Sequence, residues 1–368
     1  MKYLNHIVKN INITLLIIPL LFAVISIVMI ASSGYRGAFV FTRDVKVQTL
    51  AYILGFVAMI IMIVIDYSVF ENMDKFLYIF SVGILLMVYI PGLGSTQMGA
   101  QSWIKLGPLN FQPSELAKLS FALLFACYIK KNHSELQSFK GFIKAVLYAA
   151  PIILLIMKND LGSSLVLCAM VIIIMWYAGL SGKILAITIA IGAALMPVVY
   201  HFLADHQKLR IDAFLNPDDL SIKANWQVFN SKVAIGSGGL KGKGLFHGTQ
   251  KELDFVPVQK SDFIFSVIAE ELGLIGGVVL IVLFAVFLFK IFKMSINAKD
   301  LYGSLITMGI FAMFFFQIFE NIAMTMGIMP VTGITLPFIS YGGSGIMSNM
   351  AALGLVLGIG IRSRDRSF

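Results

Sequence analysis

Charge is scarce in this sequence. Aspartate, glutamate, lysine and arginine together make up 13% of its 368 residues, whereas a soluble domain averages about 25%. Hydrophobic residues reach 58%, and the mean hydropathy is +0.89. The composition therefore excludes an ordinary soluble globular domain and is typical of a protein with several membrane-spanning segments.

Cysteine and histidine are also rare, with two and five copies. Cys127 and Cys168 both fall within apolar runs, where cysteine usually behaves as a small buried hydrophobic residue. No Cys/His spacing suits zinc, and no disulfide framework is indicated. We expect no certain cofactor, although a divalent cation such as magnesium or manganese could assist at a site that handles phosphate.

Acidic residues are outnumbered by basic ones, 19 against 28, which gives a net charge of +9. The basic residues are dispersed over many loops, so we expect no binding to nucleic acid. A positive charge spread in this way suits a protein that lies beside anionic lipid headgroups.

Long apolar runs are abundant, and most approach the roughly 20 residues that an α-helix needs to cross the hydrocarbon core. Backbone groups in hydrocarbon must be satisfied internally, so these runs are expected to be helices. We predict an all-α polytopic membrane protein, a single domain over residues 1–368, with about ten transmembrane helices. The predicted spans are 13–32, 48–65, 76–92, 114–129, 142–157, 162–178, 183–203, 263–292, 302–323 and 343–361.

Lysine and arginine in short loops predict the orientation, because they are enriched on the cytoplasmic side. The even number of spans places both termini on one side. We predict that this side is cytoplasmic, which makes residues 204–262, between the seventh and eighth helices, a large extracytoplasmic loop. The inner side then carries 13 basic residues and the short outer loops carry five: Lys2, Lys9, Lys75, Lys130, Lys131, Lys140, Lys183, Lys290, Lys293, Lys299, Arg362, Arg364 and Arg366 against Arg36, Arg43, Lys46, Lys105 and Lys158.

Asp262 stands where the long polar loop meets the eighth apolar run. An acid at such a boundary is costly and is usually retained for chemistry or transport. A helix from Asp262 to Phe292 would be roughly 46 Å long, against about 30 Å of hydrocarbon, so Asp262 is expected at or above the outer interface. Glu270 lies about 80° from Asp262 around such a helix. Glu270 either shares the cavity of Asp262 or pairs with lysines of the loop.

A second polar segment precedes the fourth span. Pro113 and Ser114 are typical of a helix start. Glu115 and Lys118 follow on one helix face, either as a local ion pair or with Lys118 facing an aqueous cavity that holds an anion. Trp103, a little earlier, is either an interfacial belt residue or a platform for a sugar or lipid.

Other polar residues on the predicted outer side are further candidates for substrate contact. Asp160 precedes the sixth span and could instead cap that helix. The run GSGGLKGKG offers backbone N–H groups beside Lys241 and Lys243, which could cradle phosphate or form a flexible turn. The remaining candidates are Arg210 and Gln227 in the long loop and Ser340 in the broken segment between the last two spans.

Four motifs carry a resemblance to a known family: FQPSELAKL, AIGSGGLKGKG followed by GTQ, SDFIFSVIAEELG and PVTGITLPFISYGGSG. With them, essentially the whole chain resembles the SEDS family (shape, elongation, division and sporulation), and GTQ favours its RodA branch over FtsW and SpoVE. The resemblance implies an inverting peptidoglycan glycosyltransferase that polymerises lipid II on the outer face of the bacterial cytoplasmic membrane and maintains rod shape. It also implies a class B penicillin-binding protein and other elongation-complex membrane proteins as partners.

The resemblance makes Asp262 the essential aspartate and places Trp103 and Lys118 in the family's motifs. We predict that Asp262 takes the proton of the acceptor hydroxyl. The candidates that stabilise the departing pyrophosphate are Lys118, Arg210, Lys241 and Lys243, of which Lys118 and Arg210 are preferred. The chain departs from the family in the run PVQKSD, where Val258 and Lys260 replace an acidic, histidine-containing pattern, and at Gln101 and Ser102, where an arginine often stands.

Two other function classes are compatible with the same residues. A lipid II transporter, or flippase, would use the charged cavity to pass its substrate across the bilayer. A scaffold for cell-wall enzymes would have no chemistry of its own. The division and sporulation branches of the family would share the polymerase chemistry.

Overall fold

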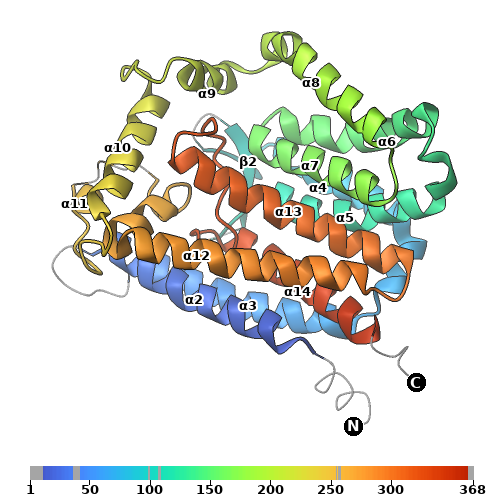
Figure 1. Ribbon diagram of the computed structural model, residues 1–368, viewed down its shortest axis with the longest axis horizontal. Coiled ribbons are helices and arrows are strands. Elements are labelled where there is room, and N and C mark those ends of the chain that lie inside the picture. Colours follow the sequence, from blue (N-terminus) through green and yellow to red (C-terminus); the bar gives the residue numbers. More distant parts are fainter. Residues whose placement is uncertain are drawn as a thin grey trace.

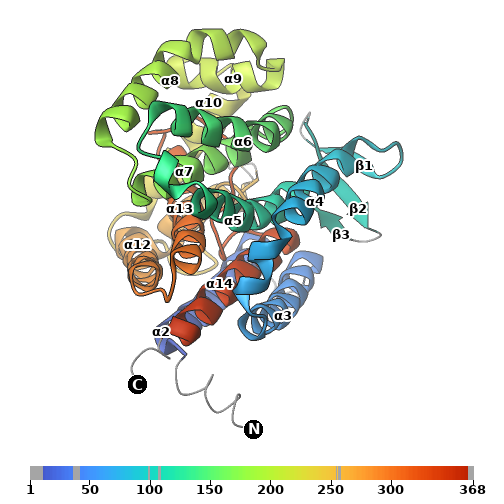
Figure 2. The same cartoon turned by 90° about the vertical axis from the view of Figure 1, so that its right-hand side faces the viewer.

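The computed structural model describes residues 11–35, 42–97, 100–106, 109–253, 255 and 258–363, so Lys2, Lys9, Arg36, Arg364 and Arg366 lie outside the described residues. The described chain is mostly helical, with one small sheet (Figures 1 and 2). Its α-helices are α2 Ile13–Ser33, α3 Arg43–Val64, α4 Asp74–Leu86, α5 Pro113–Lys131, α6 Phe139–Met157, α7 Leu161–Tyr177, α8 Gly182–Phe202, α9 Asp205–Leu215, α10 Lys223–Gly238, α11 Thr249–Glu252, α12 Ile264–Ile296, α13 Leu301–Thr325 and α14 Gly343–Ser363. Its 3-10 helices are η1 Tyr67–Met73, η2 Met87–Tyr89 and η3 His133–Glu135.

Every predicted span coincides with a helix, the third being the continuous run η1–α4–η2, so the predicted architecture is confirmed. Among the described residues, eight helices are long and apolar enough to cross a membrane by length and composition. The other two spans are α5 and α7. Helix α7 has only 17 residues. Helix α5 carries Glu115 and Lys118, but it is enclosed by other helices, so it does not have to present an apolar face to lipid.

The two ends of the helical bundle differ. Figure 1 shows the beginning of α2 and the end of α14 at one end, and α10 and α11 at the other.

The protein core between the two ends is rich in aromatic rings. Phe338, from the segment between α13 and α14, is fully buried with its ring 5.8 Å from that of Phe22 and 5.3 Å from that of Phe314. The hydroxyl of Tyr52 donates to the Phe338 carbonyl. These contacts fix the segment between α13 and α14 on the bundle.

One segment of the mostly helical chain forms a small sheet that was not predicted from the sequence. Three antiparallel strands, β1 Gly94–Gln97, β2 Ala100–Leu106 and β3 Leu109–Phe111, form a small sheet in the order β1-β2-β3, which Figure 2 shows beside α4. The pairing Ser95↔Trp103 joins β1 to β2, and Ile104↔Phe111 joins β2 to β3. This connection is too polar and too rich in glycine for a membrane helix, and strand pairing satisfies its backbone groups.

Helix α12 is broken at Gly273, which has φ +68° and ψ −168°. The break receives the glycine-rich run of the long loop. Leu274 N–H donates to Gly239 O at 2.8 Å, and Lys243 N–H donates to Glu270 O at 3.0 Å. A Cβ on Gly242 would lie 2.1 Å from Glu271 O, so only glycine permits this approach of two backbones. The run is therefore a packed backbone junction, and these N–H groups are not free to cradle phosphate.

Candidate functional site

A cavity of about 450 Å³ lies at one end of the bundle. The first residues of α3, α5 and α14, the residues just before α7 and α12, and the segment after α13 all contribute to its wall. The positive ends of five helix dipoles therefore converge on it, which favours anionic groups. The lining of the cavity includes Arg43, Asp44, Trp103, Gln112, Glu115, Asp160, His206, Arg210, Val258, Ser261, Asp262, Thr332, Gly333, Thr335 and Tyr341.

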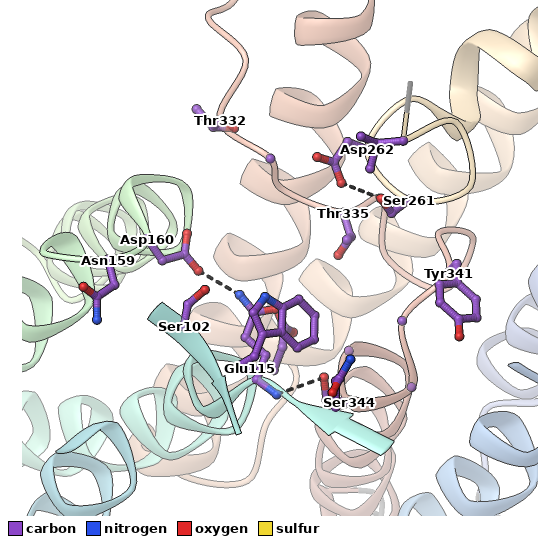
Figure 3. Close-up of a pocket in the computed structure, with 18 of the residues that line it drawn as sticks. Ser102, Glu115, Asn159, Asp160, Ser261, Asp262, Thr332, Thr335, Tyr341 and Ser344 are labelled. Carbon is purple, nitrogen blue, oxygen red and sulfur yellow. Dashed lines mark hydrogen bonds between the residues drawn. The ribbon is translucent and has the colours of Figure 1, made fainter. Parts of the chain in front are cut away.

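Asp262 lies on one wall of this cavity, in the turn that precedes α12 (Figure 3). Ser261 Oγ donates to Asp262 Oδ1 at 2.8 Å. No lysine or arginine among the described residues comes within 4.0 Å of the carboxylate. Burial raises the pKa of Asp262 above the ordinary value of an aspartate, while the Ser261 hydrogen bond and the charge of Arg210 act in the opposite direction. Asp262 is therefore an acid with raised proton affinity that faces a cavity.

Arg210 and Asp262 both lie beside Gly333. A Cβ built on Gly333 would lie 3.4 Å from Arg210 Nη1 and 3.5 Å from Asp262 Oδ2. Gly333 also has φ +79°, which a larger residue adopts only with strain. Arg210 Nη1 donates to Thr332 O at 2.5 Å, which fixes the guanidinium while its other N–H groups remain available.

Two buried side chains fix the backbone that carries Asp262. Asn321 Nδ2 donates to Asp262 O at 2.9 Å and to Ile334 O at 2.7 Å, and so joins the start of α12 to the segment after α13. Ser340 Oγ donates to Ser261 O at 2.5 Å and accepts from Leu336 N–H at 2.8 Å. Ser340 does not line the cavity, so in this structure it positions the segment that carries Asp262.

We expect that Asn321→Leu lowers both the stability and the activity of the protein. The substitution removes both hydrogen bonds. It leaves the buried Ile334 carbonyl without this donor, at a cost of about 1–3 kcal/mol, and the half-buried Asp262 carbonyl without its donor at a smaller cost. The activity loss should exceed the fraction of unfolded protein, because the position of Asp262 changes in the folded molecules. The measurements are thermal unfolding in detergent and the initial reaction rate at a temperature where the variant is folded.

Asn349→Leu is the matched control. Asn349 is a buried asparagine on α14 whose Oδ1 has no hydrogen-bond partner, and it does not line the cavity. Equal rate losses in the two variants would contradict a positioning role for Asn321.

Asp160 faces Asp262 from the opposite wall (Figure 3). Its Oδ1 accepts from Ser163 N–H at 2.9 Å, so it caps α7, as one of the two predictions proposed. Its Oδ2 accepts from Gln112 Nε2 at 2.9 Å and from Ser114 Oγ at 3.2 Å. Asp160 thus ties the starts of α5 and α7 together and also lines the cavity.

Glu115 and Lys118 form the predicted local ion pair, with 2.7 Å between Nζ and Oε1 and with both side chains buried. Glu115 lines the cavity, whereas Lys118 lies behind it. Lys118 therefore contacts Glu115, and the prediction that Lys118 itself faces the cavity is not met. Trp103, held by β2, lines the cavity as a sugar or lipid platform would.

The departure at Lys260 has a structural counterpart at the rim of the cavity. Lys260 Nζ lies 2.7 Å from Asp44 Oδ2, and Asp44 lines the cavity. The additional positive charge is therefore paired. Val258, which replaces a family carboxylate, also lines the cavity and has φ +56°, a strained conformation for a β-branched residue.

Of the two alternatives for Glu270, pairing with a lysine of the long loop is confirmed, and sharing the cavity of Asp262 is not. Glu270 is buried against the glycine-rich junction, where Lys243 Nζ lies 2.7 Å from its Oε1 and Gln250 N–H donates to the same oxygen at 2.9 Å. The angle predicted between Asp262 and Glu270 assumed that both lie on one helix, but Asp262 precedes α12 and is not part of that helix. Two further candidates outside the cavity lining are Lys241, which is exposed, and Gln227, which is half-buried on α10.

Several lining residues were not identified from the sequence: Arg43, His206, Thr335 and Tyr341. Burial and the charge of Arg210 lower the pKa of His206, so its ring is mostly neutral at pH 7. The glycines and prolines of residues 324–345 were the only signal for Thr335 and Tyr341. Nothing in the local sequence of Arg43 or His206 distinguished them from other loop residues.

The donor set of the cavity does not match a metal site held by the protein alone. Within the part of the chain that the structure describes, no three His, Cys, Asp or Glu side chains gather closely enough to hold a metal ion. Both oxygens of Asp160 accept hydrogen bonds from protein groups.

Comparison with known proteins gives consistent results. The family model FtsW/RodA/SpoVE, described as cell cycle protein, matches residues 8–365. The peptidoglycan glycosyltransferase MrdB of Escherichia coli (strain K12) is 35% identical over 347 residues, which cover 94% of this chain and 92% of MrdB.

Two solved structures share the fold over 97% of this chain. One has a TM-score of 0.81 and 28% identity, with 98% of that chain covered. Its description is "Structural coordination of polymerization and crosslinking by a peptidoglycan synthase complex". The other is the rod shape determining protein RodA of Thermus thermophilus, with a TM-score of 0.70 and 27% identity, again with 98% of that chain covered.

Proposed function

The chain belongs to the FtsW/RodA/SpoVE family of cell cycle proteins, and we infer that it is a peptidoglycan glycosyltransferase. It is a membrane protein with multiple spans. The reaction joins the disaccharide units of lipid II into β-1,4-linked glycan strands. We assign the protein to cell elongation and rod-shape maintenance, the role of the RodA branch, while the division and sporulation branches would use the same chemistry.

The observation that carries the proposal is the position of Asp262. It faces a cavity at one end of the bundle. Arg210 and the N-termini of several helices line the same cavity. A hydroxyl acceptor requires a base, and a departing phosphate requires positive charge. Asp262 and Arg210 line the same cavity, which supports these two roles for them.

In the proposed step, the 4-hydroxyl of the acceptor sugar attacks the anomeric carbon of the donor. A bond forms between the 4-oxygen and that carbon, and the bond from the carbon to the pyrophosphate oxygen breaks. The proton of the hydroxyl passes to Asp262, and the electron pair of the broken bond leaves with the pyrophosphate. A single displacement inverts the α-linked donor to a β-linked product.

Arg210 is the cation placed to stabilise the departing pyrophosphate. Its guanidinium and the Asp262 carboxylate both lie beside Gly333, and the Thr332 carbonyl uses only one of its N–H groups. Arginine suits this role because its planar fork binds phosphate oxygens in pairs. Any magnesium or manganese would arrive with the pyrophosphate, since magnesium in such sites is held mainly by substrate phosphates and one or two carboxylates.

We further propose that the cavity opens on the extracytoplasmic face of a bacterial cytoplasmic membrane, with both termini in the cytoplasm. The excess of lysine and arginine in the loops at the opposite end supports this orientation. We also propose that the protein works with a class B penicillin-binding protein and other elongation-complex membrane proteins. The similar fold in a peptidoglycan synthase complex supports a cross-linking partner.

The transporter alternative requires a route from both sides of the membrane. The lining residues of the cavity come from one end of the bundle. Ion pairs join helices near the opposite end, with 2.6 Å between Lys130 Nζ and Glu71 Oε1 and 2.7 Å between Lys131 Nζ and Asp74 Oδ2. The arrangement therefore favours an enzyme.

The test uses the purified protein with its penicillin-binding partner, lipid II and detergent. We expect glycan strands that grow with time and release undecaprenyl pyrophosphate. A parallel assay follows lipid II across the bilayer of sealed vesicles that contain the protein. Translocation without polymer formation would contradict the glycosyltransferase assignment and support a transporter.

A further inference from the structure

A second cavity of about 410 Å³ adjoins the one that contains Asp262. It lies between α9, α10 and the turn that follows α13, and Arg210 lines both cavities. Ser231 Oγ on α10 donates to Thr325 O at the end of α13 at 2.7 Å, which holds the two sides together. The second cavity is thus a built part of the fold.

The lining of the second cavity suits a ligand in which an anionic group is attached to an apolar chain. Its two basic side chains are Arg210 and Lys232, opposed by one acid, Asp218. Lys232 has no ion pair among the described residues. Apolar side chains, including Phe214 and Phe229, form much of the remaining wall.

Exposed apolar residues surround the second cavity. On α10, Trp226 is 42% exposed and Phe229 is 43% exposed, and in the turn after α13, Ile328 is 60% exposed. Gly327 in this turn has φ +74° and lies against Val228 of α10. Large apolar groups so exposed at the end of a membrane bundle fit contact with lipid chains. An isoprenoid chain can therefore enter the second cavity from the membrane interface.

We propose that the second cavity binds the pyrophosphate and first isoprene units of the donor lipid, with Arg210 and Lys232 on the phosphates. This inference rests on the proposed glycosyltransferase function and adds Lys232 to its site. The sugar of the donor then projects past Arg210 into the first cavity, where the acceptor hydroxyl meets Asp262. When the bond from the anomeric carbon to the phosphate oxygen breaks, the prenyl diphosphate remains in the second cavity.

The test measures binding of farnesyl diphosphate, a soluble prenyl diphosphate, to the purified full-length protein by calorimetry. Lys232→Gln is expected to weaken this binding about 10-fold, the effect of one charged hydrogen bond. Lys223→Gln, an exposed lysine on the same helix outside the second cavity, is expected to have no effect. Unchanged binding in Lys232→Gln would overturn the proposal.

Two further arms identify the ligand. Ala224→Trp fills the second cavity, so it should weaken farnesyl diphosphate more than inorganic diphosphate; equal effects on both would overturn the isoprene assignment. Short-chain phosphatidylglycerol should compete poorly, and competition as strong as that of farnesyl diphosphate would overturn the proposal in favour of an ordinary anionic-lipid site. Because binding is measured without turnover, failure of the polymerase assay and failure of this inference are distinguishable.

Discussion

Asp262→Asn is expected to reduce the initial rate of glycan polymerisation by about 100- to 10,000-fold, the contribution of a positioned general base. Asparagine has nearly the same size and still accepts the hydrogen bond from Ser261. It carries no basic oxygen that can take the proton of the acceptor hydroxyl. The measurement is polymer formed per minute from lipid II by the purified protein with its partner.

The matched control is Asp219→Asn, an exposed acid in the same long loop that lines neither cavity. It should retain the wild-type rate. Thermal unfolding and lipid II binding should be nearly unchanged in Asp262→Asn, since only proton transfer is removed. Polymerisation near the wild-type rate by this variant would exclude Asp262 as the base.

Lys251→Met is expected to lower the free energy of unfolding by about 3–5 kcal/mol, the usual effect of breaking a buried ion pair. Lys251 of α11 and Glu271 of α12 form an ion pair, and both side chains are fully buried. Ser32 of α2 donates to Glu271 Oε1 at 2.6 Å. Removal of the lysine leaves a buried carboxylate without its cation where three helices meet. The measurement is the unfolding midpoint in detergent at matched protein and lipid concentrations.

Two variants separate the cost of the unpaired charge from other effects. Lys251→Met combined with Glu271→Leu removes both charges and should recover most of the stability. Lys144→Met breaks the ion pair between Lys144 and Glu135, whose two side chains are 47% and 49% exposed. Because solvent screens this pair, the variant should unfold at nearly the wild-type midpoint. A double variant no more stable than Lys251→Met would contradict this explanation.

The helical architecture could be predicted because hydrocarbon imposes one simple requirement on the backbone. Each of the ten predicted apolar runs coincides with a helix, and the helix-length argument placed Asp262 at the end of the bundle. Glu115 and Lys118 paired as their spacing indicated, since a three-residue separation fixes the geometry within one helix. Local sequence determines contacts of this kind.

The rest depends on contacts between segments far apart in the chain. Arg210 and Asp262 line the same cavity only because α9, the start of α12 and the segment after α13 come together, with both side chains beside Gly333. Glu270 pairs with Lys243 because α12 breaks at Gly273 and receives a distant glycine-rich run. Asn321 bonds the carbonyls of Asp262 and Ile334, and neither acceptor could be predicted from the sequence. Periodicity within a helix does not specify such partners.

The pH dependence of polymerisation tests most directly whether Asp262 is the base. A general base acts when it is ionised, so the rate should fall tenfold per pH unit below the pKa of Asp262. Burial raises that pKa, so the fall should begin above the ordinary aspartate value of about 3.9. Lipid II binding measured over the same range controls for unfolding. Arg210→Gln removes a charge that lowers the pKa of Asp262 and should move the fall to higher pH. A rate that is independent of pH through the acid range, in folded protein that still binds lipid II, would contradict the account.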